Sequence, residues 1–281
     1  CKVIAIDKNK RTILLENQKQ LGYEKLIIAT GSIVKKLKTN GNETDLYYLR
    51  TINDSLKIRE KLRKDNNITI VGAGYIGLEI ASVAVKKNLQ VRILEMENRV
   101  MSRVVSSEVS DFFQNKHQLE GVKFKFNTYI TDIEDDGKQK KIICNDGSYF
   151  NSNVVIVGVG IEPNNELAKI SGLKCNNGIL VDDNGQTSDP HIFAVGDCCN
   201  HPNNIFKQRL RLESVQNAVE QAKSIAGFIA GNHKPSQKVP WFWSDQYNIK
   251  LQIAGISQDH DNRVIRGSPS DGKFAVFYQK E

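Results

Sequence analysis

Three glycines and one acid are spaced as they are in dinucleotide-binding sites. Gly72, Gly74 and Gly77 form a G-x-G-x-x-G pattern, and Glu95 follows about 20 residues on. The first glycine of such a pattern permits a tight turn, the second lets the backbone approach a pyrophosphate, and the third lets a helix lie close on a strand. Glu95 can hydrogen-bond the ribose hydroxyls and would repel a 2′-phosphate, so the pattern predicts a preference for NAD over NADP.

The elements expected around these glycines are those of a βαβ unit. The β-branched run Ile68–Val71 predicts a buried strand, residues 78–85 follow an apolar helical pattern, and Val91–Leu94 predicts a second strand before Glu95. The helix N-terminus would face the phosphate charge. A glycine-rich turn without a ligand is the alternative, and we favour the dinucleotide site because every part of the unit occurs in order.

A second carboxylate, Asp197, follows Gly196 at the end of another buried strand. Ligands of open α/β folds bind at the carboxyl edge of the sheet, so Asp197 could accept hydrogen bonds from a polyol such as the ribityl chain of a flavin. Its alternative role is the N-cap of a following helix, which residues 198–202 (CCNHP) do not favour. An earlier strand ends in Ala-Thr30-Gly31 and is a first indication of a second nucleotide site, although a plain strand and turn has equal weight.

Two later segments carry further candidates. Residues 211–218 begin a helix expected to reach Ala230, and its small polar N-terminus would present amide donors and a positive dipole end to a reduced flavin ring. A simple amphipathic helix is the alternative. Residues 240–247 (PWFWSDQY) contain both tryptophans; such clusters are most often core, yet the mixture with polar residues suggests a surface that meets a ring or a partner.

Other patterns predict supporting elements. Thr51 and Asp54 have the spacing of a capping box at the start of a helix. A helix around Glu108–His117 is expected to bury Val109, Phe112 and Phe113 and to leave His117 at the surface. Short strands with Asp-Gly turns follow it as a meander.

The composition is that of an ordinary globular protein. The chain has 281 residues, a formal net charge of +7 and five cysteines without metal-ligand spacing, so we expect reduced thiols in a cytoplasmic protein. Its apolar runs are too short for a bilayer, and its basic residues do not interleave with aromatics as in nucleic-acid-binding proteins. The charge fits an acidic protein partner. Because strands are predicted at both ends, we expect a piece of a longer protein.

Taken together, these motifs resemble the FAD-dependent ferredoxin reductases of the putidaredoxin and rhodocoxin reductase type. The resemblance extends over the whole chain, and its most specific parts are ESVQNA at 213–218 and PWFWSDQY at 240–247. It implies that NADH gives a hydride to FAD, which passes single electrons to an acidic [2Fe–2S] ferredoxin serving an oxygenase. In the family a first FAD half-site precedes the segment that begins here at Cys1, so we expect FAD binding to depend on it.

The resemblance also assigns site residues. On the FAD side it implies Thr30, Gly31, Arg50, Gly196, Asp197, Ser214 and Val215, with Trp243 near the ferredoxin face. On the NAD side it implies Gly72, Gly74, Tyr75, Ile76, Gly77, Glu79 and Glu95, with Gly160 near the nicotinamide. Glu79 could position the carboxamide end of the nucleotide, and a purely structural helix glutamate is equally compatible with its place.

The fold class expected is α/β, with two Rossmann-like domains of the glutathione reductase type and the start of a C-terminal α+β domain. The predicted boundaries are 1–48 and 164–238 for the FAD-binding domain, 49–163 for the NAD-binding domain and 239–281 for the C-terminal part. Two alternatives to the reductase remain: a flavin oxidoreductase that works through a redox-active cysteine, and an NAD-binding fragment without turnover.

Overall fold

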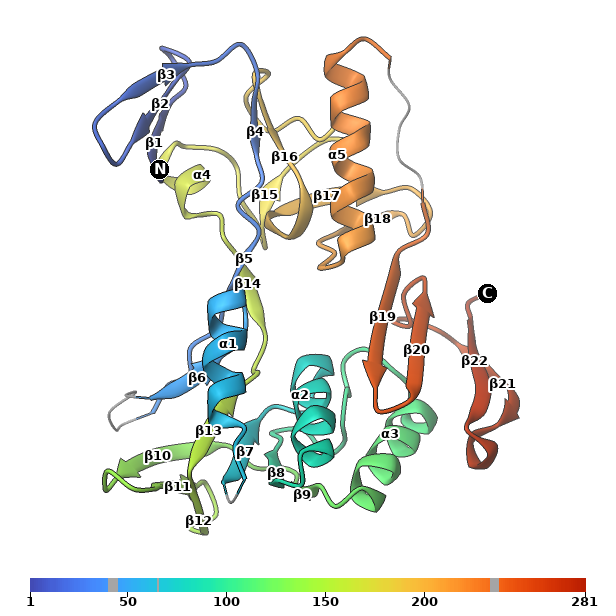
Figure 1. Cartoon of the computed structure of the whole chain (residues 1–281). Helices are drawn as coiled ribbons and strands as arrows, with labels where there is room; N and C mark the ends of the chain where they lie inside the picture. The colour runs from blue at the N-terminus through green and yellow to red at the C-terminus, as the bar shows by residue number, and fades with distance from the viewer. Residues whose placement is uncertain (40–44, 65, 233–237) are drawn as a thin grey trace. The chain divides into compact units, whose positions relative to one another are not determined.

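A computed structural model describes residues 1–39, 45–64, 66–232 and 238–281 (Figure 1). The chain divides into two compact units. Unit 1 comprises Cys1–Ile33, Ile161–Phe242 and Gln252–Gly255, and unit 2 comprises Val34–Gly160, Trp243–Leu251 and Ile256–Glu281. The domain boundaries given by the sequence stay a prediction.

Unit 2 is built on a parallel sheet of five strands in the order β6-β13-β7-β8-β9. These strands are β6 (Leu46–Tyr48), β7 (Asn67–Val71), β8 (Gln90–Leu94), β9 (Lys123–Lys125) and β13 (Val154–Val157). Among the residues described, the α-helices of this unit are α1 (Ile52–Lys61), α2 (Tyr75–Lys86) and α3 (Ser107–Leu119). From β7 the chain continues to β8 and β9 on one side, and β13 pairs on the other. The glycine loop therefore follows β7 at the point where the strand order reverses, which is where α/β sheets bind ligands.

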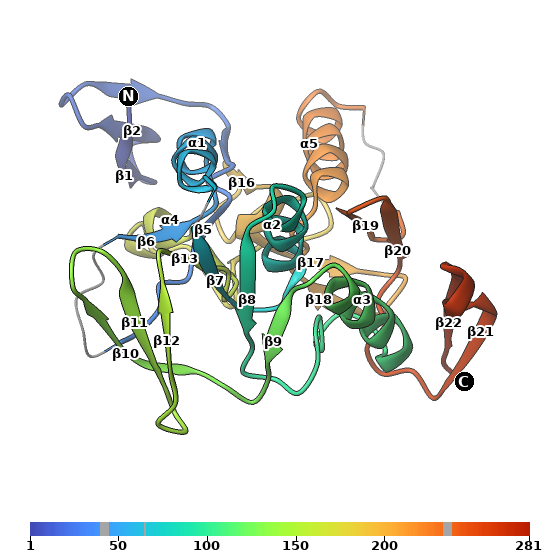
Figure 2. The ribbon, with the colours of Figure 1, turned by 60° about the horizontal axis from the view of Figure 1, so that its bottom comes forward.

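The sequence explains why this sheet is buried. Strand β13 is a run of four valine and isoleucine residues, all of them buried, as expected for a parallel strand covered on both faces. An antiparallel sheet is formed by β10 (Ile130–Asp135), β11 (Lys140–Cys144) and β12 (Tyr149–Ser152) (Figure 2). Ile130 and Ile133 of β10 and Ile142 of β11 share a core with Val155 and Val157 of β13. The meander is thus confirmed for these three strands, whereas the strand predicted at its start, residues 123–126, is β9, which pairs in parallel with β8.

The described part of unit 1 contains several small sheets and two α-helices. Its strands include the antiparallel set β1 (Val3–Asp7), β2 (Thr12–Leu15) and β3 (Gln20–Gly22), the parallel pair β4 (Leu26–Ile28) and β16 (Ile192–Ala194), and the set β15 (Ile179–Leu180), β17 (Cys199–Asn203) and β18 (Gln208–Leu210). Its helices are α4 (Glu166–Ile170) and α5 (Val215–Ile229). The strand expected to run into the turn at Thr30-Gly31 is β4, which ends at Ile28, and Gly31 adopts φ +67 between β4 and β5 (Ser32–Val34). Strand β5 pairs with β14 (Ile161–Pro163).

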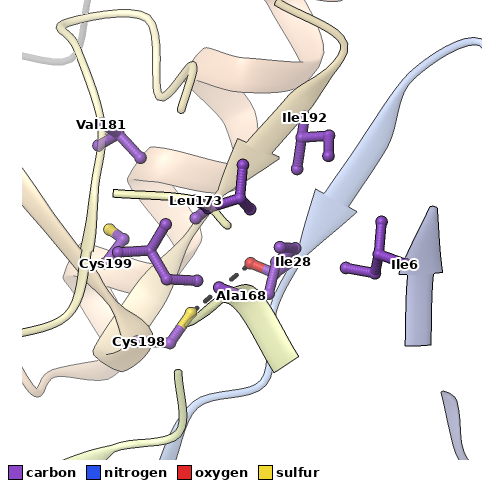
Figure 3. Packing of buried hydrophobic residues seen from close by; sticks show 10 residues of the cluster. Ile6, Ile28, Ala168, Leu173, Val181, Ile192, Cys198 and Cys199 are labelled. Carbon is purple, nitrogen blue, oxygen red and sulfur yellow. Dashed lines mark hydrogen bonds between the residues drawn. The ribbon is translucent and has the colours of Figure 1, made fainter. Parts of the chain in front are cut away.

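The core of unit 1 joins residues from distant parts of the sequence (Figure 3). Ile6, Ile28 and Ile192 pack with Cys198 and Cys199, and the Cys198 thiol donates to the Ile28 carbonyl. These two cysteines behave as small apolar side chains, as buried free cysteines commonly do.

The C-terminal part consists of short strands. They are β19 (Trp241–Gln246), β20 (Ile249–Ala254), β21 (Asn262–Ser268) and β22 (Lys273–Gln279), and they form two two-stranded sheets (Figure 1). Within the described ranges, no helix is both long and apolar enough to cross a bilayer. The α/β class predicted from the sequence is confirmed.

Candidate nucleotide and flavin sites

The glycine loop of unit 2 is shaped by two backbone approaches that only glycine permits. Gly72 has φ +100, and a Cβ there would lie 2.5 Å from the Gly158 carbonyl oxygen, in the loop that follows β13. A Cβ at Gly77 would lie 2.2 Å from the Gly72 carbonyl oxygen, so helix α2 lies directly on the loop. A Cβ at Gly74 would meet nothing within 4 Å. The loop is tight at its first and third glycines and open at its second, as a bound pyrophosphate requires.

The carboxylate of Glu95 holds this loop. Its Oε2 accepts from the Ala73 N–H at 2.5 Å, and its Oε1 accepts from the Glu97 N–H at 2.9 Å. A carboxylate offers about four lone-pair positions, so one on each oxygen is left for ribose hydroxyls. Glu95 therefore has a structural task that the spacing did not reveal, in addition to its predicted contact with the nucleotide.

Glu79 lies one turn into α2 and is half-buried. Its Oε1 accepts from the Ser244 hydroxyl of β19 at 2.6 Å. Burial raises the pKa of Glu79, while hydrogen bonds from Ser244 and the Asp245 backbone oppose that rise. The partners of Glu79 thus come from the far end of the sequence.

The other residues predicted on the NAD side lie in the same unit. Tyr75 and Ile76 form the first turn of α2, and the Ile76 side chain is exposed. Gly74 is the N-cap and has no side chain that could accept from this turn, which suits a helix N-terminus that receives a phosphate. Gly160 has φ +106, and its carbonyl accepts from the Lys35 N–H at 3.0 Å.

Unit 1 brings together four of the residues predicted on the FAD side. Strands β4 and β16 are parallel, so the segments that follow them, Thr30-Gly31 and Gly196-Asp197, lie at the same edge. The Ser32 hydroxyl donates to Asp197 Oδ2 at 2.9 Å, and the Gly196 N–H donates to Gln221 Oε1 of α5 at 2.8 Å. Asp197 lies inside the short 3₁₀ helix η1 (Gly196–Cys198), so it does not cap a following α-helix. A carboxylate at this sheet edge has the acceptor chemistry that a ribityl chain requires.

The N-terminus of α5 completes this part of unit 1. Ser214 is the N-cap, and its side chain accepts from the Asn217 N–H. Val215, the first helical residue, is 64% exposed. Such an end offers amide donors next to an apolar surface, which suits the edge of a flavin ring.

Two predicted residues lie in unit 2 and not with the unit 1 group. The Arg50 N–H donates to Asp54 Oδ2 at 3.2 Å. The neighbouring capping box is confirmed, because the Thr51 hydroxyl accepts from the Asp54 N–H and the Asp54 carboxylate accepts from the Thr51 N–H. Trp243 is 42% exposed on β19, in accord with its prediction as a surface aromatic.

The prediction for His117 was wrong. Its side chain is fully buried, and it bonds Gln246 and Tyr247. The prediction failed because His117 lies in the last turn of α3, where residues are commonly exposed. The strand that covers it is over 100 residues away in the sequence. A signal was present in residues 243–246, where Ser244 and Gln246 alternate with Trp243 and Asp245 as on a strand with one buried polar face.

Comparison with known families agrees with this geometry. The profile described as pyridine nucleotide-disulphide oxidoreductase matches residues 1–222, and the profile described as reductase C-terminal matches residues 241–281. The chain belongs to the pyridine nucleotide-disulphide oxidoreductase family. Members of this family use FAD and NAD(P)H, so both predicted cofactors are those of the family.

The chain is similar to two curated reductases. The chain is 38% identical to putidaredoxin reductase of Pseudomonas putida, over 98% of this chain and 67% of that protein. It is also 38% identical to rhodocoxin reductase of Rhodococcus erythropolis, over 98% of this chain and 65% of that protein. It therefore spans about two thirds of the length of these relatives. The family resemblance inferred from the motifs is confirmed.

Solved structures give the same result. A ferredoxin reductase from Rhodopseudomonas palustris matches with a TM-score of 0.96 and 38% identity, over 99% of this chain and 70% of that one. The reductase in the covalent putidaredoxin reductase–putidaredoxin complex matches with a TM-score of 0.96 and 37% identity, over 99% and 69%.

Proposed function

We propose that the protein to which this chain belongs transfers a hydride from NADH to FAD and then passes single electrons to a [2Fe–2S] ferredoxin that serves an oxygenase. The observation that carries the proposal is the glycine loop, closed at Gly72 and Gly77, open at Gly74 and held by the Glu95 carboxylate. Family membership and the two reductase relatives support it.

In this proposal unit 1 contributes the flavin contacts. Asp197 would accept from the ribityl hydroxyls, Thr30 and Gly31 would contact the cofactor from the same sheet edge, and Ser214 and Val215 would lie at the pyrimidine end of the ring. FAD supplies the chemistry that converts a two-electron hydride into single electrons. Arg50 is a further proposed contact.

Unit 2 would bind NADH. Gly74 would admit the pyrophosphate to the N-terminus of α2, Glu95 would bind the adenosine ribose, and Glu79 and Gly160 would lie near the nicotinamide. No acid–base residue is needed, because hydride transfer depends on holding the two rings in contact and excluding water.

The partner we propose is an acidic ferredoxin. The net charge of +7 would steer such a partner, and the exposed ring of Trp243 offers an apolar contact at its surface. We place the reaction in the cytoplasm, which the five free cysteines support.

Thiol chemistry is the less favoured alternative. Cys198 and Cys199 are buried, and burial raises the pKa of Cys199 to about 12. Since the thiolate is the reactive form, this pair is poorly suited to electron transfer through a disulfide.

The test is spectroscopic. The full-length protein to which this chain belongs is mixed with FAD, desalted, and titrated anaerobically with NADH, then in a second sample with NADPH. We expect a retained flavin band that NADH bleaches and NADPH leaves, and re-oxidation by a [2Fe–2S] ferredoxin. Asp197→Asn should retain less flavin, whereas the exposed Asp183→Asn in the same unit should match the parent. Equal bleaching by both nucleotides, or a reduced flavin that no ferredoxin re-oxidises, would contradict the proposal.

A further inference from the structure

A continuous chain of hydrogen bonds begins at Glu79 and joins residues of unit 2 that lie on three elements. Ser244 Oγ bonds Glu79 Oε1 at 2.6 Å, and Gln246 Nε2 bonds Ser244 Oγ at 3.1 Å. Gln246 Oε1 bonds His117 Nε2 at 2.9 Å, and His117 Nδ1 bonds the Tyr247 hydroxyl at 3.0 Å. The chain thus connects α2, β19 and α3 through side chains alone.

The middle of the chain is shielded from water. Ser244, Gln246 and His117 each have 0% of their surface exposed. Buried polar groups are costly unless every one is paired, and fully satisfied networks fix a single arrangement. The end of the β19–β20 hairpin is held as well, because Lys86 Nζ of α2 donates to the Tyr247 carbonyl at 3.0 Å.

The charge on Glu79 dictates the direction of every bond. An ionised carboxylate only accepts, so the single hydroxyl hydrogen of Ser244 goes to Glu79. Ser244 Oγ must then receive a hydrogen from the amide of Gln246, which leaves Gln246 Oε1 facing His117. Because that oxygen only accepts, His117 must carry its hydrogen on Nε2, and its Nδ1 accepts from Tyr247. All four donors therefore point towards Glu79.

We propose that Ser244, Gln246 and His117 are positioning residues that orient the Glu79 carboxylate, and hold it ionised, for binding of the pyridine nucleotide. The inference rests on the proposed function in one respect, namely that Glu79 contacts the nucleotide. Strand β19 also carries Trp243 on its opposite face, so the same bonds fix the strand that presents this exposed ring.

The first test needs no nucleotide. In ¹⁵N-histidine-labelled parent protein at neutral pH, the ring nitrogen shifts of His117, assigned from the signal that His117→Gln loses, should report the Nε2–H tautomer. The directed chain allows only this form. An Nδ1–H tautomer, or a rapidly exchanging mixture, would overturn the network.

The second test measures NAD⁺ affinity by calorimetry. Ser244→Ala and Gln246→Leu should each weaken NAD⁺ binding about tenfold, as expected for hydrogen bonds that support a charged group. The control is Ser152→Ala, since Ser152 is also a fully buried serine of unit 2 but bonds the Val154 carbonyl instead. It should bind NAD⁺ like the parent, although it loses a comparable buried hydroxyl.

The outcomes separate the two proposals. If the parent itself does not bind NAD⁺, the proposed function fails, while the tautomer measurement still decides the network. If the parent binds NAD⁺ and the Ser244 and Gln246 variants bind it equally well, Glu79 is not positioned by this chain. Unfolded variants leave the parent's tautomer as the deciding result.

Discussion

Single atoms decide the glycine loop. A methyl group at Gly77 would overlap the Gly72 carbonyl, whereas one at Gly74 would point into open space that a pyrophosphate could use. The fold therefore requires glycine at position 77, whereas the proposed ligand requires it at position 74.

This difference gives a paired prediction. Gly77→Ala should lower the free energy of unfolding by about 1–3 kcal/mol, because the loop must move to admit the Cβ. Gly74→Ala should unfold like the parent yet raise the KM for NADH at least about tenfold. Denaturant unfolding and steady-state kinetics of both variants check this. Equal losses of unfolding free energy in Gly77→Ala and Gly74→Ala would contradict the prediction that only position 77 is too tight for a Cβ.

Glu95 combines loop support with nucleotide choice. Glu95→Gln keeps an acceptor for the Ala73 N–H but removes the charge that would repel a 2′-phosphate. We expect the ratio of kcat/KM for NADPH to that for NADH to rise at least about tenfold, since like charges close together near a surface interact by several kcal/mol. The control is Glu120→Gln at the exposed C-cap of α3, which should leave this ratio unchanged. An unchanged ratio in Glu95→Gln would show that Glu95 does not determine the preference for NADH over NADPH.

At the level of elements, helix α1 depends on its capping box. The Thr51 hydroxyl accepts from the Asp54 N–H, and the Asp54 carboxylate accepts from the Thr51 N–H at 2.8 Å. Hydrogen bonds from Thr51 lower the pKa of Asp54, so the box is intact at neutral pH.

Removing the cap should have a measurable cost. Thr51→Ala should lower the free energy of unfolding by about 1 kcal/mol, because it leaves an N-terminal amide without its acceptor. Ser55→Ala, an exposed position on the same helix, should stay within about 0.5 kcal/mol of the parent. Chemical denaturation of the two variants side by side is the measurement. A Thr51→Ala curve that overlays the Ser55→Ala curve would mean that solvent replaces the cap.

At the level of the whole molecule, each unit contains a histidine that is kept neutral. Burial lowers the pKa of His117 in unit 2 and, together with Arg209, of His201 in unit 1. Around His117, Glu120 opposes this shift and Lys116 adds to it, while Gln246 and Tyr247 are uncharged partners.

The sign of the pH dependence follows. The unfolded chain takes up protons at these histidines near pH 6.5, and the folded chain does so only at lower pH. Their contribution to stability is therefore complete above about pH 6.5 and decreases as the pH falls towards the folded pKa values. Unfolding curves between pH 7.5 and 5.5 should show this decrease, and it should be smaller in His117→Gln. Parallel pH profiles for the variant and the parent would contradict it.

Much of the fold could be predicted because its determinants are local. The run Ile68–Val71, the glycine spacing and the apolar positions of α2 specify a βαβ unit without reference to distant residues. Glu95, Asp197 and the α5 N-terminus could likewise be proposed as site residues, because sheet edges and helix ends follow directly from the order of the elements.

The tertiary structure decided which distant residues became partners. The sequence determined that Glu79 lies one turn beyond the glycine loop, but it left a structural or a functional role open. Only the folded chain places Ser244 and Gln246 against it and buries His117 behind them, because β19 comes to α2 and α3 after more than 100 intervening residues. Helical and strand periods say which face of an element is buried; what covers that face depends on long-range packing, and this is why the hydrogen-bond chain could not be predicted.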